Sequence, residues 1–244
     1  REALGGQNRM AAAMASRRLF GEITRWQQHQ LEKLQIDIRL GAKATAESIL
    51  ALEPQAVVIA TGSRPARDGY SSLRPDVLKV PGTDQENVFT VWDVFERPYA
   101  IGQDVILIAD DPHLTGAYVA EHLSERGHKV RLVTPQIYPA NDLNPKLATE
   151  VIHRLRAKNV EIHTSLILGE VDGDSARFRD RFSENQETFE GFDSIVLSTR
   201  NEAEDSLIEP LKASGIEIFS VGDSVAPRRI EDAIVDGERA GWMI

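Results

Sequence analysis

The 244-residue sequence predicts an α/β fold built on parallel sheets, and three observations support this. Strand-like and helix-like segments alternate along the chain, as in folds whose parallel strands are joined by helices. Two runs rich in β-branched residues, "AVVIATG" at 56–62 and "DVILIA" at 104–109, are almost continuously apolar, as expected of strands covered on both faces. A complete strand–turn–helix–strand unit, "VILIADDPHLTGAYVAEHLSERGHKVRLVTP", occupies 105–135. We therefore expect doubly wound architecture.

The expected elements follow one another from the N-terminus. Residues 11–35 are rich in good helix formers, and "IDIRL" at 36–40 is predicted to be a short strand. Thr45 or Ser48 can cap a helical turn over 44–50. The later elements are a strand running into a helix at 87–96, a strand at 104–109, a helix at 114–127, a strand at 129–134, a helix at 143–159 that starts with the Asn-Pro pair 144–145, strands joined by an Asp-Gly-Asp turn in 160–180, a strand at 194–199, a strand at 215–224 and a helix at 228–244.

Two apolar strands that end in a glycine turn, at 57–62 and 218–223, enclose the complete unit at 105–135. The simplest arrangement is one Rossmann-like domain, of the type that binds FAD or NAD(P), interrupted by a second one. We therefore predict two three-layer domains of this type, one inserted in the other. The outer, FAD- or ADP-binding-like domain would span 1–96 and 204–244, and the NAD(P)-binding-like insert would span 97–203.

The first residues bear on the outer domain. A dinucleotide fold opens with a strand, a glycine-rich turn, a helix and a second strand that ends in an acid. In "REALGGQ" at 1–7 only that acid is present, as Glu2. We therefore expect the first strand and helix of the outer domain to be missing from this chain.

Composition and charge exclude several classes of protein. The net charge of −10 and the pI near 5.1 argue against binding of nucleic acid or of an anionic membrane surface. No apolar run approaches the roughly 20 residues that span a bilayer, and no signal peptide is evident. The chain has no cysteine, which fits a cytoplasmic location and removes thiolate ligands for an iron–sulfur cluster. The six histidines lack metal-site spacing, so no metal site is expected.

Three motifs carry a specific resemblance: "REALGGQ" at 1–7, "VVIATGSRP" at 57–65 and "FSVGDSVAPRRIEDAIVDGERAG" at 219–241. With them the chain resembles the C-terminal part of the family of trimethylamine dehydrogenase, histamine dehydrogenase and 2,4-dienoyl-CoA reductase. The resemblance implies an N-terminal TIM barrel that carries FMN and a four-iron cluster and is followed by the two nucleotide-binding-like domains. It also implies a homo-oligomer when the protein is full length, and an electron-transfer flavoprotein as partner.

The resemblance assigns roles to residues of the outer domain. Glycines let a backbone approach a phosphate, and an acid accepts hydrogen bonds from ribose hydroxyls. An aspartate beside a phosphate must act through water or a hydroxyl, because two anions in contact repel. The implied contacts are Glu2 with an adenosine ribose, Gly5 and Gly6 with the nucleotide backbone, Ala44 with adenine, Thr61 and Gly62 with the pyrophosphate, and Gly222 and Asp223 with the ribitol or pyrophosphate. Apart from the resemblance, Arg228 is a candidate phosphate contact, because it begins the last helix just after the turn at 222–223.

The first turn of the insert departs from the NAD(P)-binding pattern G-x-G-x-x-G. The turn "ADDPHLTG" at 109–116 keeps one glycine, Gly116. Asp110 and Asp111 put negative charge where a pyrophosphate would sit, and Pro112 removes a backbone donor. The following strand also lacks the ribose-binding acid. We therefore predict that the insert does not bind NAD(P), which makes the chain more similar to the amine dehydrogenases, whose turn is also degenerate, than to the NADPH-dependent reductases.

The favoured hypothesis is an adenine-nucleotide-binding region of a flavin and iron–sulfur oxidoreductase of amine dehydrogenase or demethylase type. No catalytic residue is expected in the chain itself, because substrate oxidation would occur on FMN in the barrel. The nucleotide would be ADP or FAD. Two alternatives stay open: the FAD- and NADPH-binding region of a dienoyl-CoA reductase-like enzyme, and a non-catalytic module that binds ADP and helps to dock a partner.

Overall fold

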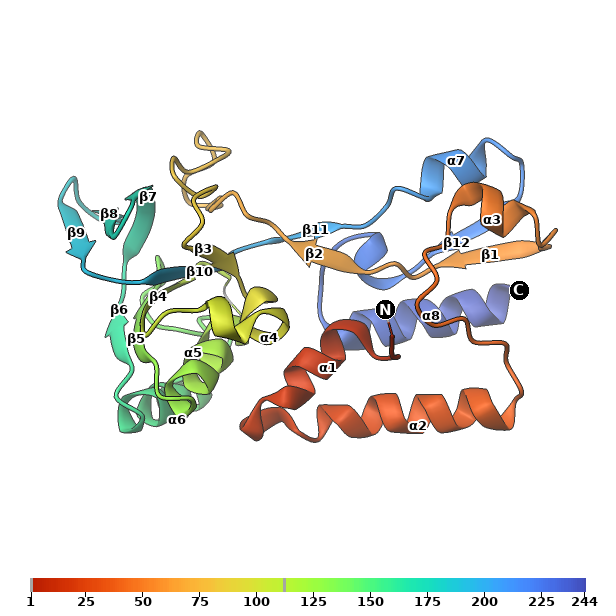
Figure 1. Cartoon of the computed structure of the whole chain (residues 1–244), viewed down its shortest axis with the longest axis horizontal. Helices are drawn as coiled ribbons and strands as arrows, with labels where there is room; N and C mark the ends of the chain where they lie inside the picture. The colour runs from red at the N-terminus through yellow and green to blue at the C-terminus, as the bar shows by residue number, and fades with distance from the viewer. Residues whose placement is uncertain (1, 112) are drawn as a thin grey trace. The chain divides into compact units, whose positions relative to one another are not determined.

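The computed structural model describes residues 2–111 and 113–244, which form two compact units (Figure 1). The smaller unit comprises the residues up to Leu4, Asp37–Arg64 and Asn201–Ile244. The larger unit comprises Gly5–Ile36 and Pro65–Arg200. The boundaries of these units differ from the predicted domain boundaries. The stretches 5–36 and 65–96, which were predicted to belong to the outer domain, belong to the larger unit.

A five-stranded parallel sheet forms the centre of the larger unit. The strand order in this sheet is β3-β10-β4-β5-β6. All neighbouring strands are parallel, so each connection between them is a crossover. The central strands are buried because both faces of the sheet are covered. The strands are β3 (Val88–Thr90), β4 (Asp104–Ala109), β5 (Lys129–Val133), β6 (Glu161–His163) and β10 (Ser194–Ser198).

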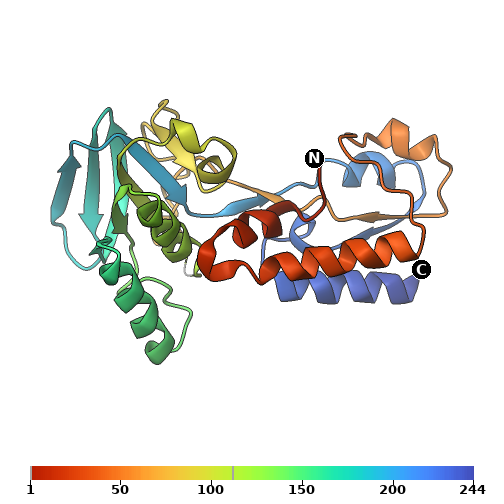
Figure 2. The ribbon, with the colours of Figure 1, turned by 60° about the horizontal axis from the view of Figure 1, so that its bottom comes forward.

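Different layers cover the two faces of this sheet (Figures 1 and 2). On one face α5 (Thr115–Glu125) and α6 (Pro145–Ala157) share an apolar core with the sheet. On the other face an antiparallel sheet packs through a second core, and it consists of β7 (Leu166–Asp172), β8 (Ser175–Asp180) and β9 (Gln186–Glu190). The short elements α4 (Asp93–Glu96) and η2 (Pro98–Ala100) connect β3 to β4. The predicted α/β class with parallel sheets is confirmed.

The segment before residue 37 is helical, but it is not one helix. It forms α1 (Gly6–Ala13), η1 (Ala15–Arg17) and α2 (Phe20–Lys33). The break lies at Met14, whose backbone is extended with φ −80° and ψ 134°. Its side chain is only 7% exposed and belongs to the core between the large sheet and its helices. Burial of one methionine in a neighbouring core therefore interrupts the helix.

Polar contacts hold the same segment on α5. The Ser16 hydroxyl donates to the buried Glu121 carboxylate at 3.2 Å. The Arg17 guanidinium lies 3.7 Å from the centre of the Tyr118 ring, a cation–π contact. Glu121 also accepts from Arg154 of α6, at 3.3 Å. The first helices of the chain are thus anchored to the layer that carries the insert's own helices.

The predicted strand at 36–40 is wrong. Ile36 and Leu40 are 52% and 51% exposed, and the segment has no secondary structure beyond a turn. The Arg39 guanidinium instead pairs with Asp37 at 3.0 Å on the surface. Alternating apolar residues make a strand only where a neighbouring strand supplies hydrogen bonds.

The smaller unit is built on two short parallel strands, β1 (Ala56–Ile59) and β12 (Glu217–Ser220). Ile59 is buried but Val58 is 44% exposed, so β1 is not covered on both faces as its sequence predicted. The strands β2 (Ser63–Pro65) and β11 (Asn201–Ala203) form a second pair. The other elements are α3 (Ala46–Leu50), α7 (Ile208–Lys212), η3 (Gly222–Ser224) and α8 (Ile230–Met243).

Helix starts follow local chemistry in both units. Asn144 caps α6 by accepting from the Leu147 N–H at 3.1 Å, with Pro145 at the first helical position, as predicted. Thr45 caps α3 in a reciprocal pair with Ser48. Across the part of the chain that the structure describes, every helix is too short or too polar to cross a membrane.

Candidate nucleotide site

The candidate site begins where β1 and β12 end. Ile59 pairs with Ser220, and the Val221 N–H donates to the Ile59 carbonyl at 3.0 Å. The turns 61–62 and 222–223 follow directly, so both leave the same edge of one parallel pair. Ligands of open α/β sheets bind outside the carboxyl ends of the strands. The structure therefore brings together the two turns that the sequence marked.

A hydroxyl–carboxylate contact joins the two turns. The Ser63 hydroxyl donates to Asp223 Oδ2 at 2.7 Å, and the Arg228 N–H donates to Asp223 Oδ1 at 3.0 Å. Ser63 is only 3% exposed, and its oxygen also accepts from the Asn201 amide at 3.3 Å. Asp223 thus ties the turn after β1 to the residues that lead into α8, and its carboxylate works through a hydroxyl.

A second buried hydroxyl fixes the strand ends. Ser224 is 1% exposed, and its hydroxyl is placed to donate to the Ile59 carbonyl at 2.9 Å and the Val221 carbonyl at 2.8 Å. Each of those carbonyls stands at the end of its strand, where the regular ladder stops. Ser224 therefore links the ends of the two strands, adding a donor to the Ile59 carbonyl that already accepts from the Val221 N–H.

The two glycines of the site are needed for different reasons. Both have positive φ, +79° at Gly62 and +63° at Gly222, a region that side chains disfavour. A Cβ on Gly222 would lie 3.1 Å from the Ala233 Cβ of α8, so this glycine permits close packing. A Cβ on Gly62 would have no heavy atom within 4 Å, so the backbone there faces open space. Gly62 is the point at which a ligand can approach the backbone.

A carboxylate of α8 accepts the hydrogen bond from the backbone N–H of the second turn. The Gly222 N–H donates to Asp236 Oδ2 at 3.1 Å, and the Arg228 guanidinium pairs with the same oxygen. The Gly222 N–H, and after it the Arg228 charge, lowers the pKa of the Asp236 carboxyl. The predicted contacts Gly222 and Arg228 are therefore engaged with the protein itself. Arg228 is still 39% exposed.

The first turn is tied to the strand β11 and the residue after it. The Thr61 hydroxyl donates to the Glu204 carbonyl, and the Glu204 N–H donates to the Gly62 carbonyl at 2.9 Å. The Glu204 side chain pairs with Arg64 at 2.9 Å. This network fixes the backbone of the "ATG" turn while leaving the open side of Gly62 exposed.

The "ADDPHLTG" turn of the larger unit satisfies its own donors. The N–H groups of Asp110 and Asp111 both donate to the Ser198 carbonyl, at 3.0 and 3.1 Å. The His113 N–H donates to the Asp111 carboxylate at 2.8 Å, and the His113 ring contacts Asp142 at 2.6 Å. Pro112 lies outside the described residues. The Asp111 carboxylate thus accepts a backbone N–H of the turn that a bound anion would otherwise meet.

Burial also makes the turn a poor place for a further anion. Removal from water raises the pKa of the Asp110 carboxyl to about 6, and the charge of Asp111 raises it further, against the hydrogen bond from Ser71 and the charge of Arg181. Burial likewise raises the pKa of Asp111, against its hydrogen bond from the His113 N–H. Above its pKa of about 6 Asp110 is ionised, and at a buried position its charge repels a pyrophosphate more strongly than it would in water.

A glycine of this turn has a packing role. A Cβ on Gly116 would lie 2.6 Å from the Ala109 Cβ and 3.2 Å from its Cα. Gly116 therefore lets α5 approach β4, the role that the third glycine of a dinucleotide motif has. The turn thus has the glycine that permits helix–strand packing and lacks the glycines that would face a phosphate.

Known oxidoreductases resemble this chain. The model of the family "Pyridine nucleotide-disulphide oxidoreductase" matches residues 114–181, beginning just after the acidic turn. Dimethylamine dehydrogenase of Hyphomicrobium sp. (strain x) is 30% identical over 247 residues, covering 88% of this chain and 33% of that protein. The chain is thus similar to the C-terminal part of amine dehydrogenases.

Other matches extend over almost the whole chain. NADH oxidase of Thermoanaerobacter brockii is 26% identical over 246 residues, covering 99% of this chain and 36% of that protein. The solved structure of histamine dehydrogenase from Rhizobium sp. 4-9 has a TM-score of 0.89 at 24% identity, covering 98% of this chain and 38% of that one. The chain spans about a third of the length of these relatives.

The sequence marked nine residues, and the structure distributes them unevenly. Thr61, Gly62, Gly222, Asp223 and Arg228 gather at the carboxyl end of β1 and β12. Glu2 and Ala44 are exposed residues of the smaller unit.

Gly5 and Gly6 belong to the larger unit. Gly5 has φ +105°, and a Cβ there would lie 2.8 Å from Thr24 and Arg9 side-chain carbons. Packing of α1 on α2 is thus sufficient reason for that glycine.

Sequence reasoning missed three residues of the site: Ser63, Ser224 and Asp236. Both serines stand beside motif residues, in "ATGS" and "GDS", so their position was a usable signal. Asp236 lies on α8, 14 residues after the Gly222 whose N–H it accepts, so the local sequence gives no signal for this contact. Among the described residues no three His, Asp or Glu side chains form a group that could hold a metal ion.

Proposed function

We propose that the smaller unit binds an adenine nucleotide, ADP or FAD, within a larger flavin and iron–sulfur oxidoreductase of amine dehydrogenase or demethylase type. The observation that carries the proposal is the pairing of two glycine turns, 61–62 and 222–223, at the carboxyl end of one parallel strand pair. Such an edge is where a dinucleotide lies in folds of this type.

The residues present fit a nucleotide at the first turn. The open side of Gly62 lets a phosphate approach the backbone, and Arg228 offers a positive charge that is still partly exposed. Asp223 is held by Ser63 and the Arg228 N–H, so its carboxylate is restrained from facing a phosphate directly. Gly222 would contribute shape rather than a donor, because Asp236 takes its N–H.

The rest of the enzyme is proposed from the family. FMN and a four-iron cluster would reside in an N-terminal TIM barrel, where FMN supplies the two-electron oxidation of the substrate. This chain could not supply thiolates to a cluster, because it has no cysteine. Its own contribution would be to hold the nucleotide, to pack against that barrel and to favour docking of an electron-transfer flavoprotein, in a homo-oligomer.

Titration of the chain with ADP, FAD and NADPH by calorimetry tests the proposal. We expect saturable binding of ADP or FAD and none of NADPH. Gly62→Ala should weaken binding about tenfold or more, since a methyl group would stand where the phosphate approaches. Gly215→Ala is the matched control, because Gly215 has the same φ of +79° and equally open surroundings. Absence of ADP and FAD binding, or an equal effect of both variants, contradicts the proposal.

The nucleotide released from the full-length protein on denaturation separates the hypotheses. ADP supports the amine dehydrogenase type or a non-catalytic ADP module. FAD, together with oxidation of NADPH, supports the alternative of a dienoyl-CoA reductase-like enzyme. The relation to an NADH oxidase makes this second measurement necessary.

A further inference from the structure

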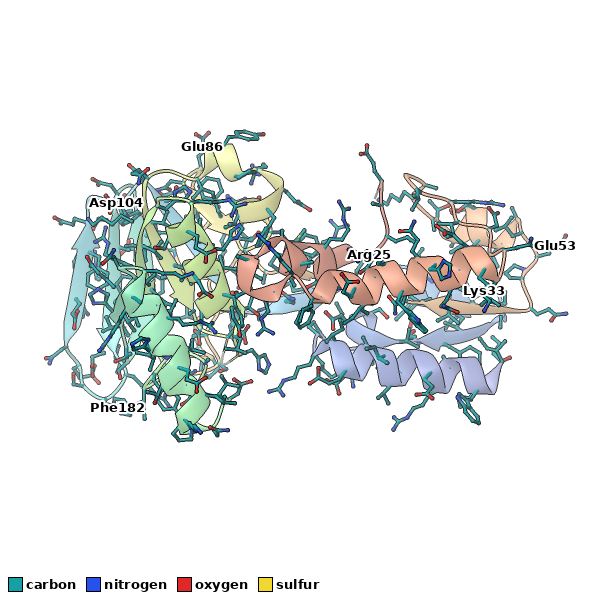
Figure 3. All side chains as sticks on the ribbon, turned by 90° about the horizontal axis from the view of Figure 1, so that it is seen from below. Arg25, Lys33, Glu53, Glu86, Asp104 and Phe182 are labelled. Carbon is teal, nitrogen blue, oxygen red and sulfur yellow. The ribbon has the colours of Figure 1, made fainter. Side chains whose placement is uncertain are left out.

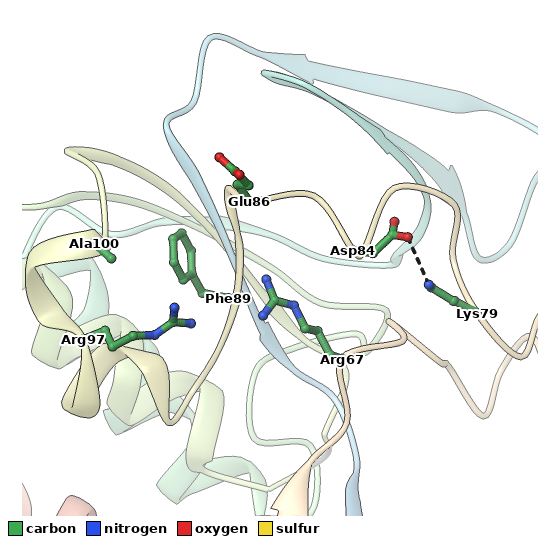
Figure 4. Close-up of a pocket in the computed structure, with 7 residues that line it drawn as sticks. All are labelled: Arg67, Lys79, Asp84, Glu86, Phe89, Arg97 and Ala100. Carbon is green, nitrogen blue, oxygen red and sulfur yellow. Dashed lines mark hydrogen bonds and ion pairs between the residues drawn. The ribbon is translucent and has the colours of Figure 1, made fainter.

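A pocket of about 750 Å³ lies in the larger unit, in a region that the proposed function does not use. It is formed by the loop that precedes β3, by β3 itself and by the α4–η2 connection. Its volume lies within the range of small-molecule sites. Figure 4 shows the residues that line it: Arg67, Lys79, Asp84, Glu86, Phe89, Arg97 and Ala100.

Three cationic side chains, those of Arg67, Lys79 and Arg97, and two acidic ones, Asp84 and Glu86, line the pocket. Lys79 pairs with Asp84 at 3.4 Å, so these two neutralise each other at one side. The Arg67 guanidinium instead donates through Nη2 to two carbonyls, those of Gln85 at 3.3 Å and Val88. Within residues 2–111 and 113–244 no carboxylate forms an ion pair with it. Its charge is therefore only partly compensated, by the more distant Asp84.

The second guanidinium of the pocket is fixed in place. Arg97 directs Nε and Nη2 at Asp93 Oδ1, the former at 2.9 Å. Asp93 in turn accepts from the Thr90 N–H at 2.8 Å and the Thr90 hydroxyl at 3.0 Å. The Arg97 guanidinium also lies 5.7 Å from the centre of the Phe89 ring. Its Nη1 has no hydrogen-bond partner among the described residues.

The two guanidinium groups point toward the same space beside the Phe89 ring (Figure 4). Like charges that converge repel each other, and a bound anion between them removes that cost. Guanidinium groups match the planar oxygens of carboxylate and phosphate, and groups already held in place lose little freedom on binding. The feature stands out in a chain with a net charge of −10.

We propose that this pocket binds a small organic anion, through a phosphate or carboxylate group held between Arg67 and Arg97. Phe89, which is 6% exposed, contributes only the edge of its side chain to the lining. This is a second site, separate in sequence from the nucleotide site.

Calorimetric titration of the chain with pyrophosphate and with citrate, each against sodium chloride at equal ionic strength, tests the proposal. We expect saturable binding of at least one anion beyond the chloride baseline, and the tighter of the two identifies phosphate or carboxylate as the preferred group. Absence of saturation with both probes would overturn the proposal.

Substitutions locate the binding. Arg97→Gln should weaken it about tenfold or more, since each hydrogen bond to a charged group contributes that much. Arg97→Lys keeps the charge but loses the planar fork, so it should restore binding only in part. Arg67→Gln is a second variant, read together with circular dichroism because Arg67 also holds the loop to β3.

Arg25→Gln is the matched control for the change of charge. Arg25 lies on α2, which contributes no residue to the pocket, and its side chain is 74% exposed and points outward (Figure 3). Binding should be unchanged in this variant. Equal weakening in Arg25→Gln and Arg97→Gln would reduce the effect to general electrostatics and overturn the site.

Discussion

Gly116 shows how one residue can report on packing rather than on a ligand. Gly116→Ala should lower the free energy of unfolding by about 1–3 kcal/mol, because the new methyl group would lie 2.6 Å from the Ala109 Cβ. Gly21→Ala is the control, since its Cβ would make an ordinary contact at 3.5 Å with Ala12. That variant should leave stability unchanged or raise it by up to about 1 kcal/mol. Urea denaturation distinguishes the two, and a neutral Gly116→Ala would contradict the packing role.

Asp110 predicts a pH dependence of stability. Its folded-state pKa of about 6 lies above the ordinary 3.8, so its contribution favours folding below pH 4 and is lost as pH rises through 6. Asp110→Asn should therefore match the unmodified protein in acid and exceed its stability by roughly 1–3 kcal/mol near pH 7. Thermal denaturation between pH 3.5 and 8 measures the difference.

Asp180 supplies the opposite sign for comparison. Hydrogen bonding from the Phe182 N–H lowers its pKa, so its contribution is present above the ordinary value and is lost in acid. Asp180→Asn should therefore reduce stability at neutral pH and not in acid. A difference for Asp110→Asn that does not vary with pH would contradict the burial of that carboxyl.

The gathering of Thr61, Gly62, Gly222 and Asp223 could be predicted from the sequence, because parallel strands leave a sheet at the same edge. The Asp236 contact could not, since it depends on how α8 packs on the turn. Gly5 illustrates the converse: a glycine assigned to a ligand has a sufficient reason in the approach of Thr24. Contact with the nucleotide remains a prediction for all nine marked residues.

At the level of elements, the docking of α1 and η1 on the large sheet can be measured. Met14→Ala should lower the free energy of unfolding by about 2–4 kcal/mol, because it opens a cavity among buried side chains. Met243→Ala is the control: that side chain is 72% exposed, so the change should stay within about 0.5 kcal/mol. Equal effects in denaturation would show that the segment is not anchored through Met14.

Elements with local signals were predictable. The strand at 104–109 and the helix that begins at Pro145 have the predicted starts, because a β-branched apolar run and an Asn-Pro cap act locally. The segment 11–35 is helical as predicted but is interrupted at Met14, and the strand predicted at 36–40 was wrong. In both segments the outcome depended on contacts elsewhere in the fold. The Met14 side chain packs into the core of the large sheet, and residues 36–40 have no neighbouring strand to pair with.

At the scale of the whole molecule, the chain covers about a third of the length of its relatives. We can therefore predict how the chain behaves when it is isolated from the rest of such a protein. The purified chain should show no amine oxidation, no consumption of NAD(P)H and no bound iron. The physical reasons are the absence of cysteine ligands and the self-satisfied acidic turn at 109–116. Steady-state assays with a dye acceptor and iron analysis check this. NADPH oxidation would contradict the prediction for the insert.

The anchoring of α1 and η1 makes the larger unit a candidate for reassembly from separate pieces. Its two stretches, Gly5–Ile36 and Pro65–Arg200, pack together in space but are separated in the sequence by residues 37–64. If a protease cut the intervening residues 37–64, the Met14 side chain and the Ser16–Glu121 bond would still hold the first piece on the second. The two pieces, expressed apart, should therefore complement each other as a split protein does.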